Sequence, residues 1–283
     1  MPQVAVLITC HNRRAKTLSC LGALFQNLFP EGYSFDVFLV DDGCTDGSEQ
    51  AVRVRYPQVK IIKGDGNLYW NGGMRVAFAA AIEQGFDYYL WLNDDTLLYP
   101  AAIQSLITAS IDLGIKRGKS VIIVGSTQDP TDSQLTYGGV IRPNKWKTLS
   151  FKLITPKDVP VECETMNGNC VLVPHEIAKT IGNLEPRFIH AMGDLDYGLR
   201  AQCAGFAVWV MAGFAGTCSN NAVTGSYKDV SLPLTVRLHK MMQPTGLPLS
   251  SWRIFTQRHA GILWPVFWIW PYAKVMWKGV LKK

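Results

Sequence analysis

Short apolar runs alternate with helix-like segments along the first third of the chain. The apolar runs span residues 4–9, 35–40, 60–63 and 88–92. Helical patterns follow the first three runs, over residues 15–27, up to residue 51, and over residues 75–84. Strand, helix, strand, helix at this spacing predicts βαβ units with right-handed crossovers. The expected fold class is therefore α/β, with a Rossmann-like, mainly parallel sheet flanked by helices.

Polar side chains stand where three of these strands end. Thr9 ends the first run, Asp41 and Asp42 follow the second, and Asp94 and Asp95 follow the run 88–92. Open α/β sheets bind their ligands at the carboxyl ends of the strands, so these side chains are expected on one rim. Adjacent carboxylates repel each other and lose hydration there, and a divalent cation is their simplest partner. The alternative is a surface turn, because Asn-Asp-Asp-Thr is also good turn and helix-cap chemistry.

Four segments in order carry a resemblance to a known family: VAVLITCHNR, VDDGCTDGS, NLYWNGGMRVAFAAAIEQGFDYYLWLNDDT and MGDLDYGLRAQCAGF. They resemble the successive motifs of the family 2 inverting glycosyltransferases of the GT-A fold, with bacterial polysaccharide enzymes such as rhamnosyltransferases the most similar. The resemblance spans roughly residues 4–212. It implies transfer of a sugar from a UDP- or dTDP-linked donor to a saccharide hydroxyl, on a lipid-linked glycan in cell-surface polysaccharide synthesis.

The resemblance implies roles for five residues at the donor site. Asp42 accepts from the imide N–H of a uracil or thymine base, and Thr9 lies beside that base. Arg75 lies near the base and the diphosphate, at the start of a helix, where a guanidinium adds a bidentate clamp. Asp94 faces the ribose, and Asp95 binds the Mg²⁺ or Mn²⁺ that bridges the phosphates. For Thr9 an ordinary place at a strand end stays open.

By the same resemblance, Asp194 is the general base that deprotonates the acceptor hydroxyl for in-line attack at the anomeric carbon. One base is enough for inversion, because the metal assists the leaving group. Family members often carry Glu before this Asp, and here the residue is Gly193. The alternative for Asp194 is an ordinary carboxylate at a helix amino terminus. Asp196 and Arg200, four residues apart on the predicted helix, are expected to form a local ion pair.

A basic pair near the carboxyl terminus, Arg258 and His259, is the last candidate. Related enzymes often return a basic pair or a His over the diphosphate from this part of the chain. The resemblance therefore implies that Arg258 grips phosphate and that His259 completes the metal shell. Both residues could instead lie at an interface.

Charge and aromatic content divide the chain in two. The net charge is +6, but residues 226–283 hold nine Lys and Arg against one Asp, and five of the nine Trp. We expect a GT-A catalytic domain over residues 1–225 and a helical, basic and aromatic extension over residues 226–283. The uncharged stretch between His259 and Lys274 is interrupted by Pro265 and Pro271. A spanning helix needs about 20 apolar residues, so this stretch is too short and too broken to cross a membrane.

Aromatic and basic side chains together suit the headgroup region of an anionic bilayer. The expected location is the cytoplasm, at the inner face of the cell membrane. The alternative is that the tail packs on the catalytic domain or on a second subunit in an oligomer. No nucleic-acid-binding motif appears. The seven cysteines are odd in number and lack zinc-ligand spacing, which indicates reduced thiols, and no secretory leader precedes the first strand.

Two other classes of protein compete with a glycosyltransferase. A dinucleotide-dependent oxidoreductase shares the early βαβ units. It needs a glycine fingerprint after the first strand, where this chain has Thr9-Cys10-His11-Asn12. A non-catalytic protein that binds a nucleotide sugar, or a scaffold, has no need of both the Asp94–Asp95 pair and Asp194.

Overall fold

The structure is a computed structural model that describes residues 1–144 and 149–280, and its fold is α/β as predicted. Its strands are β1 (Gln3–Cys10), β2 (Ser34–Asp41), β3 (Lys60–Lys63), β4 (Tyr88–Leu92), β5 (Leu97–Leu98), β6 (Val121–Gln128), β7 (Leu135–Tyr137), β8 (Gly139–Ile141), β9 (Lys152–Leu153), β10 (Val161–Cys163), β11 (Thr165–Met166), β12 (Cys170–Pro174) and β13 (Ala207–Thr217). Its helices are α1 (Arg14–Phe25), α2 (Ser48–Arg55), α3 (Tyr69–Gln84), α4 (Ala102–Arg117), α5 (His175–Ile181), α6 (Gly193–Cys203), α7 (Leu234–Met242), α8 (Leu249–His259), the 3-10 turn η1 (Gly261–Leu263) and α9 (Trp264–Val280).

The main sheet has the strand order β10-β13-β6-β12-β4-β1-β2-β3, with β5 on β13 and β7 on β6. β3, β2, β1 and β4 are parallel neighbours, which confirms the βαβ units expected from the first third of the chain. β12 runs antiparallel to both β4 and β6, and β6 and β13 are parallel. A smaller sheet has the order β11-β8-β9.

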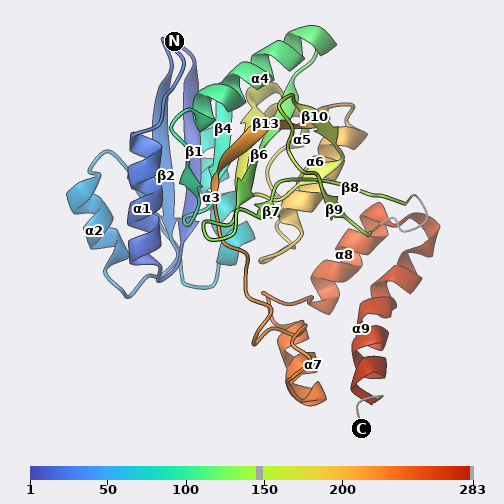
Figure 1. The fold of residues 1–283 in the computed structure, drawn as a ribbon. Coiled ribbons are helices and arrows are strands. Elements are labelled where there is room, and N and C mark those ends of the chain that lie inside the picture. The colour runs from blue at the N-terminus through green and yellow to red at the C-terminus, as the bar shows by residue number, and fades with distance from the viewer. Residues whose placement is uncertain (145–148, 281–283) are drawn as a thin grey trace.

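Helices cover both faces of this sheet (Figure 1). Along β1, Val4, Val6 and Ile8 point to one face, where they pack with residues of α1, α2 and α4. Ala5 and Leu7 point to the other face, toward α3, α5 and α6. All five side chains are fully buried. A strand that is covered on both faces is apolar at successive positions, which explains why the predicted strands are continuous apolar runs.

Helix α3 begins six residues earlier than the predicted helix over residues 75–84, at Tyr69. Its amino terminus lies against Asp42, whose carboxylate accepts the backbone N–H groups of Leu68 (3.3 Å) and Tyr69 (3.0 Å). The first N–H groups of a helix have no partner within the helix, so a carboxylate from another strand can stabilise its start. The predicted start of this helix at residue 75 is therefore wrong.

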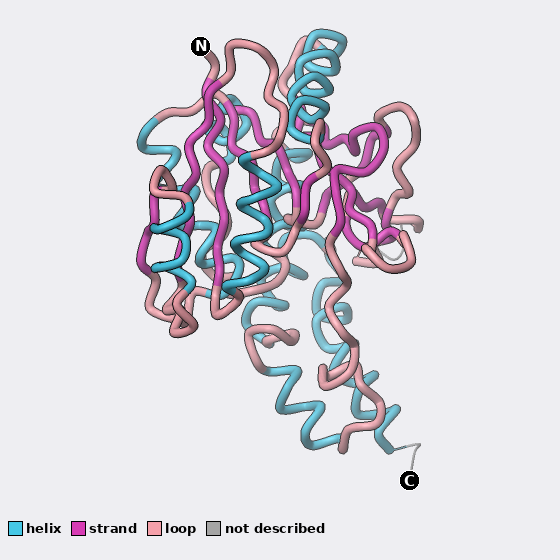
Figure 2. Tube along the Cα trace, turned by 60° about the vertical axis from the view of Figure 1, so that its left-hand side comes forward, coloured by secondary structure: helices cyan, strands magenta, loops and turns pink. Residues whose placement is uncertain are grey.

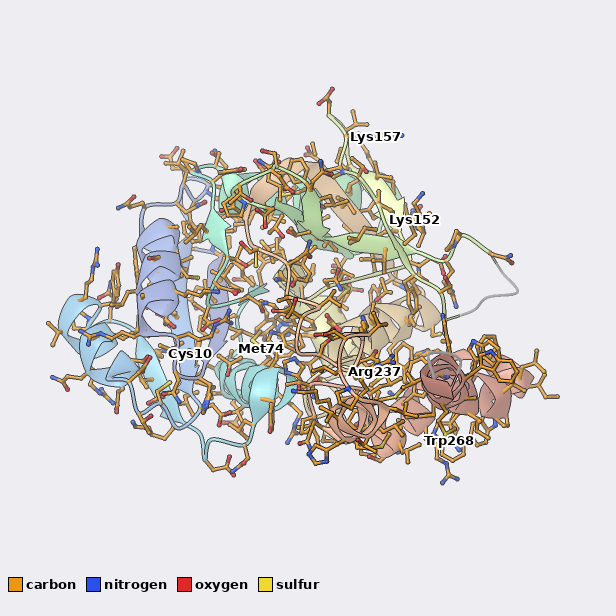
Figure 3. All side chains as sticks on the ribbon, turned by 60° about the horizontal axis from the view of Figure 1, so that its bottom comes forward. Cys10, Met74, Lys152, Lys157, Arg237 and Trp268 are labelled. Carbon is orange, nitrogen blue, oxygen red and sulfur yellow. The ribbon has the colours of Figure 1, made fainter. Side chains whose placement is uncertain are left out.

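The C-terminal segment forms three helices that extend below the carboxyl ends of the strands (Figures 1 and 2). In α8, Phe255 is fully buried and packs on Phe188 of the segment between α5 and α6, with ring centroids 6.3 Å apart. In α9, Tyr272 and Val275 pack with Met241 of α7. Figure 3 shows Arg237 of α7 and Trp268 of α9 among these helices. The last three residues of the predicted extension, 281–283, lie outside the described residues.

Helix α9 continues through Pro271, although the sequence predicted a break there. A proline inside a helix leaves the carbonyl four residues earlier without its N–H donor. That carbonyl belongs to Phe267, and the indole Nε1–H of Trp252 in α8 donates to it over 3.1 Å. The neighbouring helix thus satisfies the acceptor that the proline leaves free. Within the described residues, neither α9 nor any other helix is long and apolar enough to cross a membrane.

Candidate active site at the carboxyl ends of the strands

A cavity of about 830 Å³ opens at the carboxyl ends of β1, β2 and β4. Thr9, Asp42, Asp94, Asp95 and Asp194 all line it. The expectation that polar strand-end residues meet on one rim is confirmed for Thr9, Asp42, Asp94 and Asp95, whereas Asp41 is not among the cavity-lining residues of the described chain. The roles that the resemblance implies for these residues stay predictions.

Asp94 and Asp95 are held by cations from the segment after β1. Arg13 donates Nη1 to Asp94 Oδ1 over 2.9 Å and Nη2 to Asp95 Oδ2, and Lys16 Nζ lies 3.5 Å from the same Asp95 oxygen. Burial raises the pKa of Asp94 to about 6, although the Arg13 charge opposes this rise. The neighbouring charge of Asp95 raises the pKa further. Burial therefore disfavours the charged form of Asp94 more than its basic neighbours stabilise it.

These two carboxylates fit a hard divalent cation. They are adjacent and supply oxygen ligands, and the side chains of Asp94 and Asp95 are only 4% and 13% exposed. Carboxylate oxygens are what Mg²⁺ and Mn²⁺ prefer, and Mg²⁺ commonly takes one or two of them together with substrate phosphates. The buried charge of the pair gives a reason for binding such an ion here.

Asp42 folds the loop after β3 around its carboxylate. Besides the amides at the start of α3, it accepts the N–H of Gly66 over 2.8 Å. A Cβ at Gly64 would lie 2.7 Å from Asp42 Oδ1, so the backbone approaches too closely there for a side chain. Asp41 points to the other side of the strand end, where it accepts the Cys44 N–H (2.9 Å) and Lys63 Nζ (3.0 Å). Asp41 therefore holds the turn after β2 against the end of β3.

Asp194 stands in the first turn of α6 and is partly exposed to the cavity. Its carboxylate accepts the N–H groups of Gly168 (3.0 Å) and Leu195 (2.8 Å). Burial raises the pKa of Asp194, although these amide hydrogen bonds oppose the rise. A carboxylate with a raised pKa is a better proton acceptor, which suits a general base.

The residue before Asp194 is a glycine because Asn71 of α3 occupies the neighbouring space. A Cβ at Gly193 would lie 1.7 Å from Asn71 Oδ1. Asn71 is fully buried and donates Nδ2 to the carbonyls of Glu185 (3.0 Å) and Phe188 (2.6 Å). The departure from the Glu that family members often carry therefore has a packing reason: no side chain fits at this position.

Arg75 lies inside α3 and not at its start, so the argument from a helix amino terminus is wrong for this residue. The cavity-lining residues of the described chain do not include Arg75. Its backbone carbonyl accepts Asn183 Nδ2 over 2.9 Å. Thr9, by contrast, lies at the cavity and touches α3, since a Cβ at Gly73 would lie 2.1 Å from Thr9 Oγ1.

Arg258 and His259 both bind Asp196. Neither of them is among the residues of the described chain that line the cavity. Arg258 Nη1 and His259 Nε2 lie 2.6 and 2.8 Å from Asp196 Oδ1, and Arg200 Nε donates to Oδ2 over 2.8 Å. The predicted Asp196–Arg200 pair is thus present, within a larger cluster. A second Arg258 nitrogen reaches Glu185 over 2.7 Å. The structure therefore places this basic pair at an interface between α8 and α6, the alternative that the sequence left open.

Arg13 is the residue that sequence reasoning missed. It belongs to the quoted segment VAVLITCHNR, yet nothing in the spacing showed that it reaches two carboxylates that lie 81 and 82 residues further along the chain. The structure also brings Cys10 and Cys44 together, with sulfur atoms 3.8 Å apart beside Asp41. None of the seven cysteines, all of which lie in the described residues, is paired in a disulfide.

Comparisons with known proteins settle the family. The family model described as glycosyl transferase family 2 matches residues 5–173, more than half of the chain. The chain belongs to this family. Two Mycobacterium tuberculosis proteins, from strains CDC 1551 / Oshkosh and H37Rv, are 27% identical over 191 residues, covering 60% of this chain. Both are named N-acetylglucosaminyl-diphospho-decaprenol L-rhamnosyltransferase. The alignment spans 62% of their length.

Solved structures of other glycosyltransferases share the fold. S. aureus TarS matches 91% of this chain and 42% of its own, with a TM-score of 0.56 and 13% identity. A structure of GalNAc-T7 with UDP, GalNAc and Mn²⁺ matches 75% of this chain and 42% of its own, with a TM-score of 0.57 and 12% identity. The expected GT-A fold of a family 2 glycosyltransferase is therefore confirmed.

Proposed function

We propose that this protein is a metal-dependent, inverting glycosyltransferase that moves a sugar from a UDP- or dTDP-linked donor to a saccharide hydroxyl. One observation carries the proposal. The cavity holds two carboxylate centres: Asp94 and Asp95 at the end of β4, and Asp194 at the start of α6. The first centre has the chemistry for a cation and a diphosphate, and the second has the chemistry for taking a proton.

Each centre has its own task in the proposed reaction. When bound, the divalent ion supplies positive charge for the diphosphate that leaves. Asp194 takes the proton of the acceptor hydroxyl, whose oxygen then attacks the anomeric carbon from the face opposite the diphosphate. The two amide hydrogen bonds to Asp194 fix the direction of its carboxylate. A fixed carboxylate favours one attack geometry and hence inversion.

The relatives guide the choice of sugar and acceptor. Their names describe transfer of L-rhamnose to a lipid-linked saccharide. We therefore place nucleotide-linked rhamnose first among the donors to test, and a polyprenyl-diphosphate saccharide first among the acceptors. Cell-surface polysaccharide synthesis is the corresponding role.

The test separates binding from transfer. Asp194→Asn should keep donor binding, measured as thermal stabilisation by UDP- and dTDP-sugars with Mn²⁺, and should lose about 10² to 10⁴ in transfer rate. Asp36→Asn, which removes an exposed carboxylate on β2, is the matched control and should transfer normally. Transfer by Asp194→Asn at more than about a tenth of the wild-type rate would show that another group is the base.

Contact with an anionic membrane surface belongs to the same proposal. One side of α9 packs on α7 and α8, and the other side exposes apolar residues at helical spacing, including Val266, Ile269, Trp270 and Trp277. Trp270 and Trp277 are 62% and 69% exposed. Exposed aromatic rings on a basic segment suit a lipid headgroup region, where a lipid-linked acceptor lies.

Sedimentation with anionic liposomes across a salt series tests this contact. The double variant Trp270→Ser/Trp277→Ser should bind less than the wild type, and wild-type binding should weaken with salt because basic residues contribute about 1 kcal/mol each. The control Val54→Ser/Ile115→Ser removes apolar residues that are 74% and 76% exposed on other helices. Equal binding of both double variants and the wild type would refute a membrane role for α9.

A further inference from the structure

Arg13 stands between the carboxylates that the proposed metal needs. It lies in the segment between β1 and α1, and its side chain is 38% exposed, far more than those of Asp94 and Asp95. Its two terminal nitrogens each bind a different carboxylate. The guanidinium therefore bridges the two acids, and Lys16 Nζ, 3.5 Å from Asp95 Oδ2, is the second positive charge beside them.

The other oxygens of the pair have weaker partners. Thr17 Oγ1 donates to Asp94 Oδ2 over 3.3 Å, and Cys218 Sγ lies 3.5 Å from Asp95 Oδ1. Arg13 thus occupies one oxygen of each carboxylate, Asp94 Oδ1 and Asp95 Oδ2. An ion that bound these same two oxygens at metal-ligand distances of about 2.1 Å could not coexist with the guanidinium in that position.

The position of Arg13 also suits a second set of acceptors. Arg13 lines the cavity itself, and its long side chain is 38% exposed. A guanidinium presents parallel N–H donors that match two phosphate oxygens as well as two carboxylate oxygens. The diphosphate of a donor bound at this rim would offer that second set of acceptors.

We propose that Arg13 is the counter-ion of the Asp94–Asp95 pair in the metal-free protein, and that it exchanges these carboxylates for the donor diphosphate when the divalent ion binds. The exchange rests on the proposed function, since it needs a metal and a diphosphate at this rim. It makes metal and nucleotide binding mutually dependent, beyond the direct contact between them. The metal alone must expel Arg13 from its acceptors, whereas the metal with a diphosphate gives Arg13 new ones.

Titration of the full chain with Mn²⁺ tests the exchange, with free Mn²⁺ followed by electron paramagnetic resonance. Without nucleotide, Arg13→Met should bind Mn²⁺ at least tenfold more tightly than the wild type, because no guanidinium competes. Saturating UDP should then increase Mn²⁺ affinity by a smaller factor in Arg13→Met than in the wild type. Asp95→Asn should lose the bound Mn²⁺, which identifies the site that is titrated.

Three further variants separate a competing contact from the general effect of lost charge. Arg14→Met removes the neighbouring, exposed arginine, whose main-chain N–H contacts Asp46, and should match the wild type. Lys16→Met removes a more distant ammonium, and its Mn²⁺ affinity should lie between those of the wild type and Arg13→Met. Arg13→Lys keeps the positive charge but lacks the parallel N–H donors of the guanidinium. Its Mn²⁺ affinity should lie between those of Arg13→Met and the wild type. Thermal unfolding of each metal-free variant shows that it is folded.

The outcomes distinguish the exchange from the proposed function. Equal or weaker Mn²⁺ binding by Arg13→Met overturns the exchange alone, since the metal site remains. If only Arg13→Met binds Mn²⁺, even with UDP present, Arg13 replaces the metal permanently and the exchange is wrong. Absence of Mn²⁺ binding by the wild type and every variant, with or without UDP, overturns both the metal dependence and the exchange.

Discussion

Replacing Asp196 by Asn should lower the free energy of unfolding by about 3 kcal/mol. Its carboxylate is fully buried and holds Arg200, Arg258 and His259. Removing one partner of a buried ion pair costs about 3–5 kcal/mol, because the remaining charge is left uncompensated. Here the cost should lie at the low end. Arg200 keeps two backbone carbonyls, Arg258 keeps Glu185, and both side chains are partly exposed.

Thermal unfolding measures this cost. For a chain of this size about 1 kcal/mol shifts the Tm by about 2–4 °C, so Asp196→Asn should unfold about 6–12 °C lower than the wild type. Asp36→Asn is the matched control, because it breaks the exposed Lys60–Asp36 pair, and such pairs contribute about 0–1 kcal/mol. Equal Tm shifts in the two variants would refute the view that the buried cluster holds α8 on α6.

The same variant has a predictable pH dependence. Burial raises the pKa of Asp196, but hydrogen bonds from His259, Arg200 and Arg258 outweigh it and hold the pKa below its usual value of 3.8. A carboxylate with a lowered folded-state pKa stabilises the fold above its unfolded pKa, and this stabilisation is lost as the pH falls through the folded-state value. The stability difference between wild type and Asp196→Asn should therefore shrink as the pH falls below about 4.

Two more predictions concern Asp194 and its neighbours. Burial raises the pKa of Asp194, so kcat/KM should fall tenfold for each unit by which the pH drops below a midpoint that lies above 3.8. A midpoint at or below 3.8 would exclude Asp194 as the titrating base. Gly193→Ala should destabilise the protein by about 1–3 kcal/mol through the clash with Asn71, and it should slow transfer. The double variant Gly193→Ala/Asn71→Ala should recover part of the transfer rate. If it recovers none, the clash with Asn71 is not the cause of the slow transfer.

The sequence predicted what depends on neighbours along the chain. β1, β2 and β4 are apolar runs that are followed directly by polar residues, so both the strands and the position of Asp42, Asp94 and Asp95 on one rim could be inferred. Four motifs in order then identified the family. Local pattern is enough where a buried strand must be apolar on both faces.

The sequence did not predict what depends on a distant hydrogen-bond partner. The start of α3 is stabilised by Asp42, 27 residues before Tyr69, while its glycines resemble a loop. Pro271 does not break α9, because Trp252 donates to the freed carbonyl. From the sequence, Arg258 could be expected either near phosphate or at an interface. Only the packing of α8 against α6 decides between these two positions, because it brings Arg258 Nη1 within 2.6 Å of Asp196 Oδ1.

The link between Asp196 and α8 limits how this enzyme can be taken apart or recombined. Asp196 lies two residues after Asp194 on the same helix, so the tail holds the helix that carries the proposed base. A chimaera that exchanges residues 226–283 for another segment would leave a buried carboxylate without two of its partners. To keep the helix of the proposed base in place, such a chimaera must bring its own Arg and His at the end of the helix that replaces α8. Residues 226–283 are therefore not an interchangeable module.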